Sequence, residues 1–569
     1  MTPRSVRLVD TSTRDGNQSL WGATGLTTGM VEALGPHLEA AGFAALDFTS
    51  STHLSVGVRW HEEDPWERIS RMRAVVPTTP LSFITTGMRF MSWDRSPESV
   101  LRLSTRLLAE SGLRRMQIAE PMNDTAQASA IARMAKEEGI EQVAAAVTFT
   151  ESPVHDDALY ARAAKVLAAD ENVDVVYLKD PGGLLTPERT RALVPQLRAA
   201  VGDLTFELHG HCTTGLAPQV YVLAAQLGVD VLHTAIGALS NGTSQPSALR
   251  LVENLAAVGI STDIDAGPLR EAERIIAEIA RTQGLEPGRP TELDLAYQRH
   301  QVPGGMMGTL RRQLAEIGRP DLLSAVLDEV AVVREELGWP IMVTPYSQFV
   351  GSQAVLNVLA VRSGEARWSR MPDEVLRYLL GHFGTPPGDV DPEVADRASG
   401  HPRTRELDRP LPEPSQADLR ADVAAQVGRP VVDGEVLLRT VLPAGQVDAI
   451  RPAPRWTPSP EGRSVVPGEQ VDAVRPVSGQ AAGSVVRAVG DQVDAVGSAS
   501  AQEPGPEVRT AAEQADSTRP APRQTHSPEV RTAADFVRAA CALPGWRELD
   551  VQVGAERVRL RRNQDGGRA

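Results

Sequence analysis

Several residue types are scarce in this sequence, and each scarcity excludes a class of protein. Two cysteines in 569 residues, Cys212 and Cys541, are too few for a disulfide framework, which favours a reducing compartment. No apolar run reaches the roughly 18 residues of a membrane-spanning helix, so no membrane span is expected. Basic residues are outnumbered 58 to 73 by acidic ones, and the formal net charge is −15. A nucleic-acid groove, which needs a basic face, is therefore not expected.

The start of the sequence shows no sign of a targeting segment. Its first residues, MTPRSVRLVDTS, run directly into a strand-like stretch, whereas a leader has a basic segment followed by an apolar one. Together with the few cysteines, this predicts a cytoplasmic protein.

Lysine occurs at only three positions, Lys136, Lys165 and Lys179, and the other 55 of the 58 basic residues are arginine. In such a sequence, a lysine that remains can mark a place where arginine cannot serve. Lys136 (ARMAKEEG) and Lys165 (ARAAKVLA) lie in helical patterns that are typical of solvated faces. Lys179 ends an apolar run, so it is the lysine to which we assign a chemical role.

From residue 6 to about residue 237, short apolar runs alternate with longer amphipathic stretches. This alternation predicts eight strands connected by helices, and hence a (β/α)8 barrel of the α/β class; an open doubly wound sheet is the alternative. Polar residues gather where the apolar runs end, which is where barrel enzymes place their chemistry. The expected strands are VRLVDTS (6–12), ALDFTSS (45–51), LSFITTG (81–87), RMQIAEP (115–121), QVAAAVTFT (142–150), VDVVYLKDP (173–181), LTFELHGHC (204–212) and VDVLHTAIG (229–237).

The chain divides into four predicted parts. Residues 1–264 form the barrel, and residues 265–450, which have mostly helical patterns, form an annex that completes the same domain. Residues 451–527 are rich in Pro, Gly, Ala, Ser, Val and Arg, which predicts a disordered linker. In residues 528–569 a helical pattern, AADFVRAACAL (533–543), precedes two alternating segments, ELDVQVG and ERVRLRR. These patterns predict a small helix-and-hairpin module.

Three of the predicted strands end in possible metal ligands. Asp10 ends the first strand, Lys179 the sixth, and His209 and His211 the seventh. Side chains alternate along a strand, so the two histidines point the same way. Two imidazoles and a carboxylate suit Zn, Mn or Co. A protonated Lys179 would repel the ion, whereas carbamylation by CO2 would make it an anionic ligand. The alternatives are a structural histidine pair and a capping or salt-bridged lysine.

A series of motifs carries a resemblance to a known family. In order along residues 5 to 450, they are similar to motifs in the carboxyltransferase domain of pyruvate carboxylase, the oxaloacetate decarboxylase α subunit and the transcarboxylase 5S subunit. Related aldolase-type lyases share only the Asp and His-x-His parts. The motifs are DTSTRDGNQSLWGAT (10–24), HEEDPWERI (61–69), PMND (121–124), TFTESPVH (148–155), YLKDPGGLL (177–185), HGHCTTG (209–215), NGTSQPS (241–247), HQVPGGMMGTL (300–310), VTPYSQFVGSQAVLNV (343–358) and GHFGTPPGDVDPEV (381–394).

The resemblance implies a role for individual residues. Asp10, carbamylated Lys179, His209 and His211 would bind a divalent metal. Gln18 would lie beside the substrate. Thr344 would pass a proton between the substrate and biotin. Carboxybiotin would lose CO2 at the barrel mouth, and the enolate of the carbonyl acceptor, polarised by the metal, would attack the CO2. The reverse reaction decarboxylates a β-keto acid.

The sequence departs from the family pattern in the third strand. Where the family has an arginine that pairs with the substrate carboxylate, this chain has FITTGM, which places Thr85 at that position. Losing a buried bidentate contact of this kind costs roughly 2–4 kcal/mol. Arg89 is a candidate replacement, or else a surface arginine. We therefore expect an enolisable carbonyl acceptor, of the 2-oxo acid type or another, that differs from ordinary pyruvate or oxaloacetate.

Biotin must come from elsewhere, because no lysine follows Lys179 in the sequence. The expected partners are a biotin carboxyl carrier protein that works in trans and a biotin carboxylase subunit. Residues 533–563 resemble the segment that precedes the biotinyl domain in the carrier protein of acetyl-CoA carboxylase, so the tail is expected to dock these partners. A homo-oligomer, at least a dimer, is also implied.

Two other functions remain open. One is a biotin-independent, metal-dependent aldolase-type lyase or decarboxylase, which would not need Thr344. The other is an inactive scaffold of a carboxylase complex. Metal content separates the scaffold from the enzymes, and biotin dependence separates the two enzymes.

Overall fold

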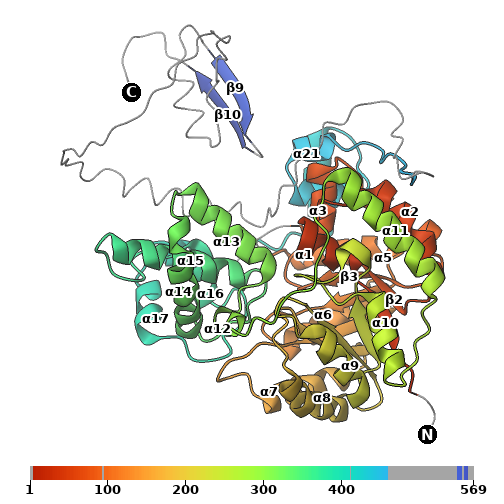
Figure 1. Cartoon of the computed structure of the whole chain (residues 1–569). Helices are drawn as coiled ribbons and strands as arrows, with labels where there is room; N and C mark the ends of the chain where they lie inside the picture. The colour runs from red at the N-terminus through yellow and green to blue at the C-terminus, as the bar shows by residue number, and fades with distance from the viewer. Residues whose placement is uncertain (1–3, 92–94, 410–411, 459–547, 554–555, 562–569) are drawn as a thin grey trace, which may run out of the picture. The chain divides into compact units, whose positions relative to one another are not determined.

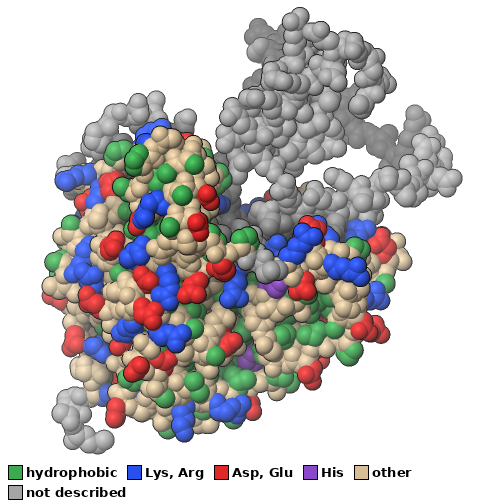
Figure 2. All heavy atoms as spheres, turned by 180° about the vertical axis from the view of Figure 1, so that it is seen from behind, with side chains coloured by type: hydrophobic (Ala, Val, Ile, Leu, Met, Phe, Trp, Pro, Cys, Tyr) green, Lys and Arg blue, Asp and Glu red, His purple; other side chains and the backbone are tan. Residues whose placement is uncertain are grey.

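The structure, a computed structural model, describes residues 4–91, 95–409, 412–458, 548–553 and 556–561. It divides the chain into two compact units, residues 1–498 and 499–569. Among the described helices, none combines the length and apolar character that crossing a bilayer requires. Figure 2 shows basic and acidic side chains interspersed over one face of the molecule.

Eight parallel strands close into a barrel in sequence order, and β1 pairs with β8. The predicted (β/α)8 barrel is therefore confirmed (Figure 1). The strands are β1 Arg7–Asp10, β2 Ala45–Ser50, β3 Leu81–Thr85, β4 Arg115–Ile118, β5 Gln142–Thr148, β6 Val175–Asp180, β7 Thr205–Gly210 and β8 Val231–Thr234.

Helices surround the barrel, and side-chain caps fix where many of them begin. Asp124, for example, accepts a hydrogen bond from the backbone N–H of Gln127 at the start of α6, and Thr186 does the same for Arg189 at the start of α8. The helices between and after the barrel strands, up to residue 283, are α1 Asn17–Trp21, α2 Thr28–Ala40, α3 Ser51–Trp60, α4 Pro65–Val75, α5 Glu98–Glu110, α6 Thr125–Glu137, α7 Asp157–Ala168, α8 Pro187–Val201, α9 Ala217–Leu227, α10 Ala248–Ala257 and α11 Ala266–Gln283.

Alternation along β7 places polar side chains in the barrel interior and apolar side chains on the outer face. In β7, Phe206 and Leu208 belong to the main hydrophobic core beneath the surrounding helices. Glu207 and His209 alternate with them, so they face the interior of the barrel. This arrangement places chemical groups inside the barrel and the stabilising apolar packing outside it.

The predicted helical annex, residues 265–450, divides between two cores. The segment between residues 297 and 407 forms a separate lobe in Figure 1, and from residue 302 onwards it makes up a second hydrophobic core together with Met122 of the barrel. Its helices are α12 Tyr297–His300, α13 Gly304–Glu316, α14 Leu323–Glu336, α15 Tyr346–Arg362, α16 Asp373–Leu379, α17 Pro392–Ser399 and α18 Thr404–Leu407. By contrast, α11 packs against α2 of the barrel.

The chain then returns to the barrel. The helices α19 Gln416–Val427, α20 Asp433–Val441 and α21 Ala444–Asp448 contribute Leu419, Leu437 and Val447 to the barrel core. Both α19 and α20 contact α5, and α21 contacts α3.

Residues 451–458, the first part of the predicted linker, contact the barrel. The N–H of Arg451 donates to the Glu62 carbonyl at 2.6 Å, and Arg71 donates to the Ala453 carbonyl at 2.7 Å. Trp456 packs against the barrel core. Residues 451–458 therefore belong to the folded unit, because their backbone and one aromatic ring find partners on the barrel. The remainder of the predicted linker lies outside the described residues.

The two predicted strands near the end of the chain are present in the second unit. β9 Glu548–Val553 and β10 Glu556–Arg561 pair antiparallel, with Glu556 opposite Val553 and Arg561 opposite Glu548. The helix predicted at 533–543 lies outside the described residues.

Candidate metal and active site

The predicted residues of β6 and β7 lie side by side at the carboxyl end of the barrel. Lys179 pairs in register with His209, and both side chains are buried. His211 follows two residues later and is also buried. Because parallel strands end at the same edge, the sequence order of these residues brings them to one place.

A carboxylate joins the two histidines, and it belongs to Asp15. Its Oδ2 lies 3.0 Å from His209 Nε2 and 3.4 Å from His211 Nε2. One oxygen or nitrogen from each of the three side chains falls within 4.8 Å of the others, which is a spacing suited to a shared ion. We call Asp15, His209 and His211 the metal cluster.

Asp10, which the sequence suggested as the carboxylate ligand, is oriented differently. Its carboxylate accepts hydrogen bonds from Ser12 N at 3.2 Å and Ser12 Oγ at 2.6 Å. Burial raises the pKa of Asp10 to about 7, although the Ser12 hydrogen bonds oppose this effect. The role of Asp10 as a ligand stays a prediction, and the geometry favours Asp15 in its place.

A π-helical turn, Ser12–Gly16 (η1), carries Asp15 to the histidines. The carbonyl of Thr11 accepts hydrogen bonds from the N–H groups of Arg14, Asp15 and Gly16, and this folds the chain back over the end of β1. A Cβ at Gly16 would lie 2.8 Å from the Leu239 carbonyl oxygen, so glycine permits this close approach. Such turns occur often at functional sites.

Buried charges around Asp15 keep it ionised. Burial by itself raises the pKa of Asp15, but the Arg14 guanidinium at 3.1 Å and the two imidazoles hold it well below its ordinary value. Arg14 also donates through Nε to Asp47 at 2.8 Å, which fixes the guanidinium in place. The cluster therefore offers a metal ion an anionic oxygen.

Lys179, next to the metal cluster, is a second titratable group with a shifted pKa. Burial lowers its pKa to about 8, and the carboxylate of Asp15 opposes that shift. A buried lysine with a lowered pKa is more readily deprotonated, and the neutral amine is the form that reacts with CO2. The predicted carbamylation is thus chemically favoured at this position.

The donor set fits a divalent metal. His211 Nδ1 lies 2.7 Å from the Thr243 carbonyl and donates to it, which leaves the Nε2 lone pair facing the cluster. The Gln245 side-chain nitrogen lies 3.1 Å from Asp15 Oδ2, 3.3 Å from His209 Nε2 and 3.1 Å from His211 Nε2. Because this amide carries positive partial charge, its position marks a place where three acceptors converge. Two imidazoles with one carboxylate suit Zn, Mn or Co.

The four residues predicted to serve the substrate lie elsewhere on the barrel mouth and annex. Gln18 is exposed on α1, and Thr344 is exposed directly before a cis bond to Pro345. Thr85 is half-buried at the end of β3, and its hydroxyl accepts a hydrogen bond from Gly87 N at 2.9 Å. Arg89 is half-buried a few residues further along. Among the described residues, the polar contacts of the metal cluster include Arg14, Ser19, His233, Thr243 and Gln245. The four substrate-side residues stay predictions.

Barrel and annex meet near the start of α15. Burial raises the pKa of the Tyr346 hydroxyl, Glu120 raises it further and Arg89 lowers it, so both of these barrel side chains lie close to Tyr346. Tyr346 follows Thr344 by two residues. Thr344, which is predicted to carry the proton, and Arg89, the candidate partner of the substrate carboxylate, therefore lie at the same junction of barrel and annex.

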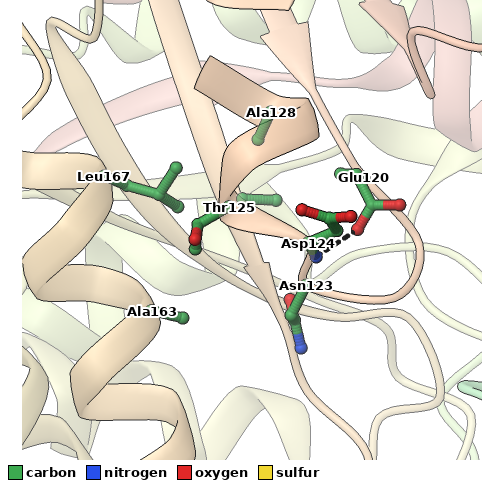
Figure 3. A pocket seen from close by; sticks show the side chains of 8 residues that line it. Glu120, Asn123, Asp124, Thr125, Ala128, Ala163 and Leu167 are labelled. Carbon is green, nitrogen blue, oxygen red and sulfur yellow. Dashed lines mark hydrogen bonds between the residues drawn. The ribbon is translucent and has the colours of Figure 1, made fainter. Parts of the chain in front are cut away.

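Glu120, two residues after the end of β4, is a candidate site residue that the sequence did not single out. It lines a small hollow (Figure 3) and accepts hydrogen bonds through Oε2 from Met122 N at 2.9 Å and Asp124 N at 2.6 Å. Its buried Oε1 has no hydrogen-bond partner in the described structure, and burial raises its pKa to about 7. The available signal was a carboxylate at the end of a predicted barrel strand, next to the PMND motif. The hollow is lined by Glu120, Asn123, Asp124, Thr125, Ala128, Ala146, Ala163 and Leu167.

Comparisons with known proteins agree with the barrel and the annex. Residues 298–451 match a family described as the conserved carboxylase domain, and residues 103–276 match the HMGL-like family. The chain is 33% identical over 393 residues to a pyruvate carboxylase subunit of Methanocaldococcus jannaschii, covering 69% of this chain and 68% of that protein. It is 29% identical over 445 residues to the 2-oxoglutarate carboxylase large subunit of Hydrogenobacter thermophilus, covering 77% of this chain and 67% of the relative.

The fold also matches a solved structure. The carboxyl transferase domain of Rhizobium etli pyruvate carboxylase superposes with a TM-score of 0.71 at 25% identity, covering 79% of this chain and 77% of that one. This match and the sequence relatives confirm the resemblance found in the motifs. The chain belongs to the family of biotin-dependent carboxyltransferases that includes the pyruvate carboxylase subunit of Methanocaldococcus jannaschii.

Proposed function

We propose that this chain is a carboxyltransferase subunit that moves a carboxyl group between carboxybiotin and a 2-oxo acid or another enolisable carbonyl compound. The observation that carries the proposal is the metal cluster at the barrel mouth with Lys179 beside it. A buried anion, two imidazoles and a lysine with a lowered pKa would hold a divalent metal ion, and such an ion would stabilise the enolate that carboxyl transfer requires.

The metal would be held by Asp15, His209, His211 and carbamylated Lys179. When bound, a divalent ion supplies positive charge that stabilises the enolate oxygen of the acceptor. The chain's own residues orient the site: Arg14 fixes Asp15, and the Thr243 carbonyl fixes the ring of His211.

Proton transfer is assigned to Thr344. As an exposed hydroxyl next to α15, it can reach a substrate that enters from outside the barrel. It would carry a proton from the acceptor's carbon to biotin as the enolate forms, and Gln18 would hold the acceptor alongside.

Biotin would be supplied in trans by a separate carrier protein that is loaded by a biotin carboxylase subunit. The support for this is chemical: biotin is attached through a lysine amide, and no lysine follows Lys179. A homo-oligomer and a cytoplasmic location remain part of the same proposal.

The acceptor is proposed to differ from pyruvate and oxaloacetate. Thr85 brings a neutral hydroxyl where the family motif has an arginine, and that hydroxyl already accepts a hydrogen bond from Gly87 N. Arg89 is the candidate cation for an acceptor carboxylate. The relative named 2-oxoglutarate carboxylase makes a longer 2-oxo acid the first acceptor to compare with pyruvate.

The test of the metal site is metal content and intact mass, measured on the wild type and on Lys179→Arg. We expect about one metal per chain in the wild type and little in the variant, since guanidinium cannot form the carbamate. Lys165→Arg is the matched control, because Lys165 is exposed on α7 and should be replaceable without loss of metal. A metal-free wild type would contradict the proposal and favour the scaffold function.

The test of the reaction uses isotope exchange between a carboxylated carrier protein and a set of 2-oxo acids. We expect exchange that requires the carrier and is abolished in Thr344→Ala. Robust exchange with pyruvate would contradict the acceptor proposal. Carrier-independent decarboxylation would contradict biotin dependence and favour the lyase.

A further inference from the structure

A single buried arginine of the annex joins it to the barrel. Arg334, on α14, is 1% exposed. Its Nη2 donates to Thr150 Oγ1 at 2.8 Å, and its Nη1 donates to the Glu151 carbonyl at 3.1 Å. Its Nε donates to the Pro340 carbonyl at 3.0 Å. The guanidinium therefore contacts the segment after β5 on one side and the segment after α14 on the other.

This cation depends on those acceptors for its burial. Among the described residues Arg334 forms no ion pair, and the Glu151 carboxylate pairs instead with Arg189 at 3.2 Å. A buried cation without an ionic partner is unfavourable unless its N–H groups find acceptors. The acceptors come from both the barrel and the annex, so the burial of Arg334 favours one arrangement of the two segments.

A second annex side chain holds the same part of the barrel. Gln301 accepts a hydrogen bond from Thr150 Oγ1 at 2.7 Å and donates to the Glu151 carbonyl at 2.8 Å. It is buried and has a left-handed φ of 52°. This conformation is uncommon outside glycine and persists where the surroundings enforce it. Two annex residues far apart in sequence thus converge on Thr150 and Glu151.

The contact at Pro340 lies four residues before Thr344. Ile341 and Met342, which follow Pro340, are buried, and so is Tyr346. The Val343 N–H donates to the Ile341 carbonyl at 2.7 Å, so the segment is a compact turn. Thr344 is exposed between these buried residues, which therefore determine where its hydroxyl lies.

We propose that Arg334 is a positioning residue that holds the segment carrying Thr344 against the barrel, so that the hydroxyl meets the acceptor at the barrel mouth. This inference rests on the proposed function, in which Thr344 carries the proton. Arg334 acts through the backbone of residues 340–344 and does not touch the acceptor. A misplacement of about 1 Å in a reacting group can cost about 100-fold in rate, so such a contact affects turnover.

Three substitutions separate positioning from general stability. Arg334→Gln removes the fork of donors. Thr150→Val keeps the size of the barrel side chain but removes its hydroxyl, and it is the milder change should Arg334→Gln fold poorly. Arg367→Gln is the matched control, because the ion pairs of Arg367 run to Glu329 and Glu336, which both belong to the annex.

The first measurement, hydrogen–deuterium exchange on the full chain, needs no activity. We expect the backbone amides of residues 341–349 to exchange about 10-fold faster in Arg334→Gln and Thr150→Val than in the wild type, because a hydrogen bond that holds the segment is lost. Arg367→Gln should leave them unchanged. Unchanged exchange in Thr150→Val, or equally fast exchange in Arg367→Gln, would overturn the inference.

The second measurement is carboxyl exchange between carboxylated carrier protein and 2-oxoglutarate or pyruvate, at matched metal content. We expect kcat to fall about 10- to 100-fold in Arg334→Gln and Thr150→Val with little change in KM, since proton transfer is affected and acceptor binding is not. The double variant should lose less than the product of the two single losses, because both changes remove the same contact.

Wild-type turnover in Arg334→Gln, or losses that multiply in the double variant, would overturn the inference. A wild type that exchanges no carboxyl group, but whose amides respond to the substitutions as expected, would count against the proposed function alone.

Discussion

At the scale of single residues, two aspartates a few positions apart compete for the role of metal ligand. Asp15 lies against both imidazoles, whereas Asp10 is held by Ser12. Asp15→Asn removes the anionic oxygen, and we expect metal affinity to fall at least about 10-fold. Asp10→Asn should retain the metal. Metal analysis after dialysis measures both variants, and the opposite result would restore Asp10 as the ligand.

Glu120 gives a pH-dependent prediction. Its pKa rises from an ordinary 4.5 to about 7 in the folded chain, chiefly because of burial. Between these pH values the unfolded chain releases the proton and the folded chain keeps it. The stability contributed by Glu120 is therefore fully present below pH 4.5 and is lost as pH rises towards 7. The total loss is about 3 kcal/mol.

Glu120→Gln should remove this dependence, because an amide does not titrate. The free energy of unfolding of the variant, minus that of the wild type, should increase as pH rises through the window. Denaturant titrations at pH values below, within and above the window measure this difference. A difference that stays constant with pH would mean that Glu120 titrates normally in the folded chain.

The sequence predicts those site residues whose side-chain direction follows from the alternation of side chains along a strand. His209, His211 and Lys179 follow from where two apolar runs end, and the structure brings them together. Asp15 does not follow, because it depends on a π-helical turn after β1 that has no simple sequence period. Burial and missing partners, which single out Glu120, depend on tertiary packing and cannot be derived from local sequence.

At the scale of helices and strands, the eight alternating units predicted the barrel because strands and amphipathic helices differ in period. The partner of each helix was less predictable. An apolar stripe on a helix predicts that one face of the helix is buried, but not which part of the molecule buries it. The apolar faces of α19, α20 and α21 pack on the barrel and not on the annex. Composition likewise could not show that residues 451–458 pack on α2 and α4, since their Pro-rich sequence resembles that of the residues after 458.

The contact of residues 451–458 with α2 gives a prediction for one glycine. A Cβ at Gly29 would lie 2.4 Å from the Pro454 carbonyl oxygen, whereas a Cβ at Gly57 of α3 would meet nothing within 4 Å. Gly29→Ala should destabilise the fold by about 1–3 kcal/mol through overpacking. Gly57→Ala, the matched control, should stabilise it by up to about 1 kcal/mol through helix propensity. Denaturant unfolding of both variants tests this, and stabilisation by Gly29→Ala would argue against the contact.

At the scale of the whole molecule, the chain contains a catalytic body and a separate unit that has a β-hairpin. The body holds both hydrophobic cores and all the residues assigned to the chemistry. The described hairpin is two six-residue strands. An isolated hairpin is at best marginally stable in water, so a role in docking to a partner explains the tail better than independent folding does.

Deleting residues 528–569 tests that role while leaving the metal site in place. We expect the shortened chain to keep its metal content and unfolding midpoint, because the described residues of the barrel and annex cores all lie before residue 459. It should lose co-purification with the biotin carrier protein, and its carboxyl exchange should then require much higher carrier concentrations. The catalytic step at saturating carrier should be unchanged, since the residues assigned to it lie in the body. Undiminished co-purification would show that the carrier is recognised by the barrel mouth or the annex, and the tail would then need another partner.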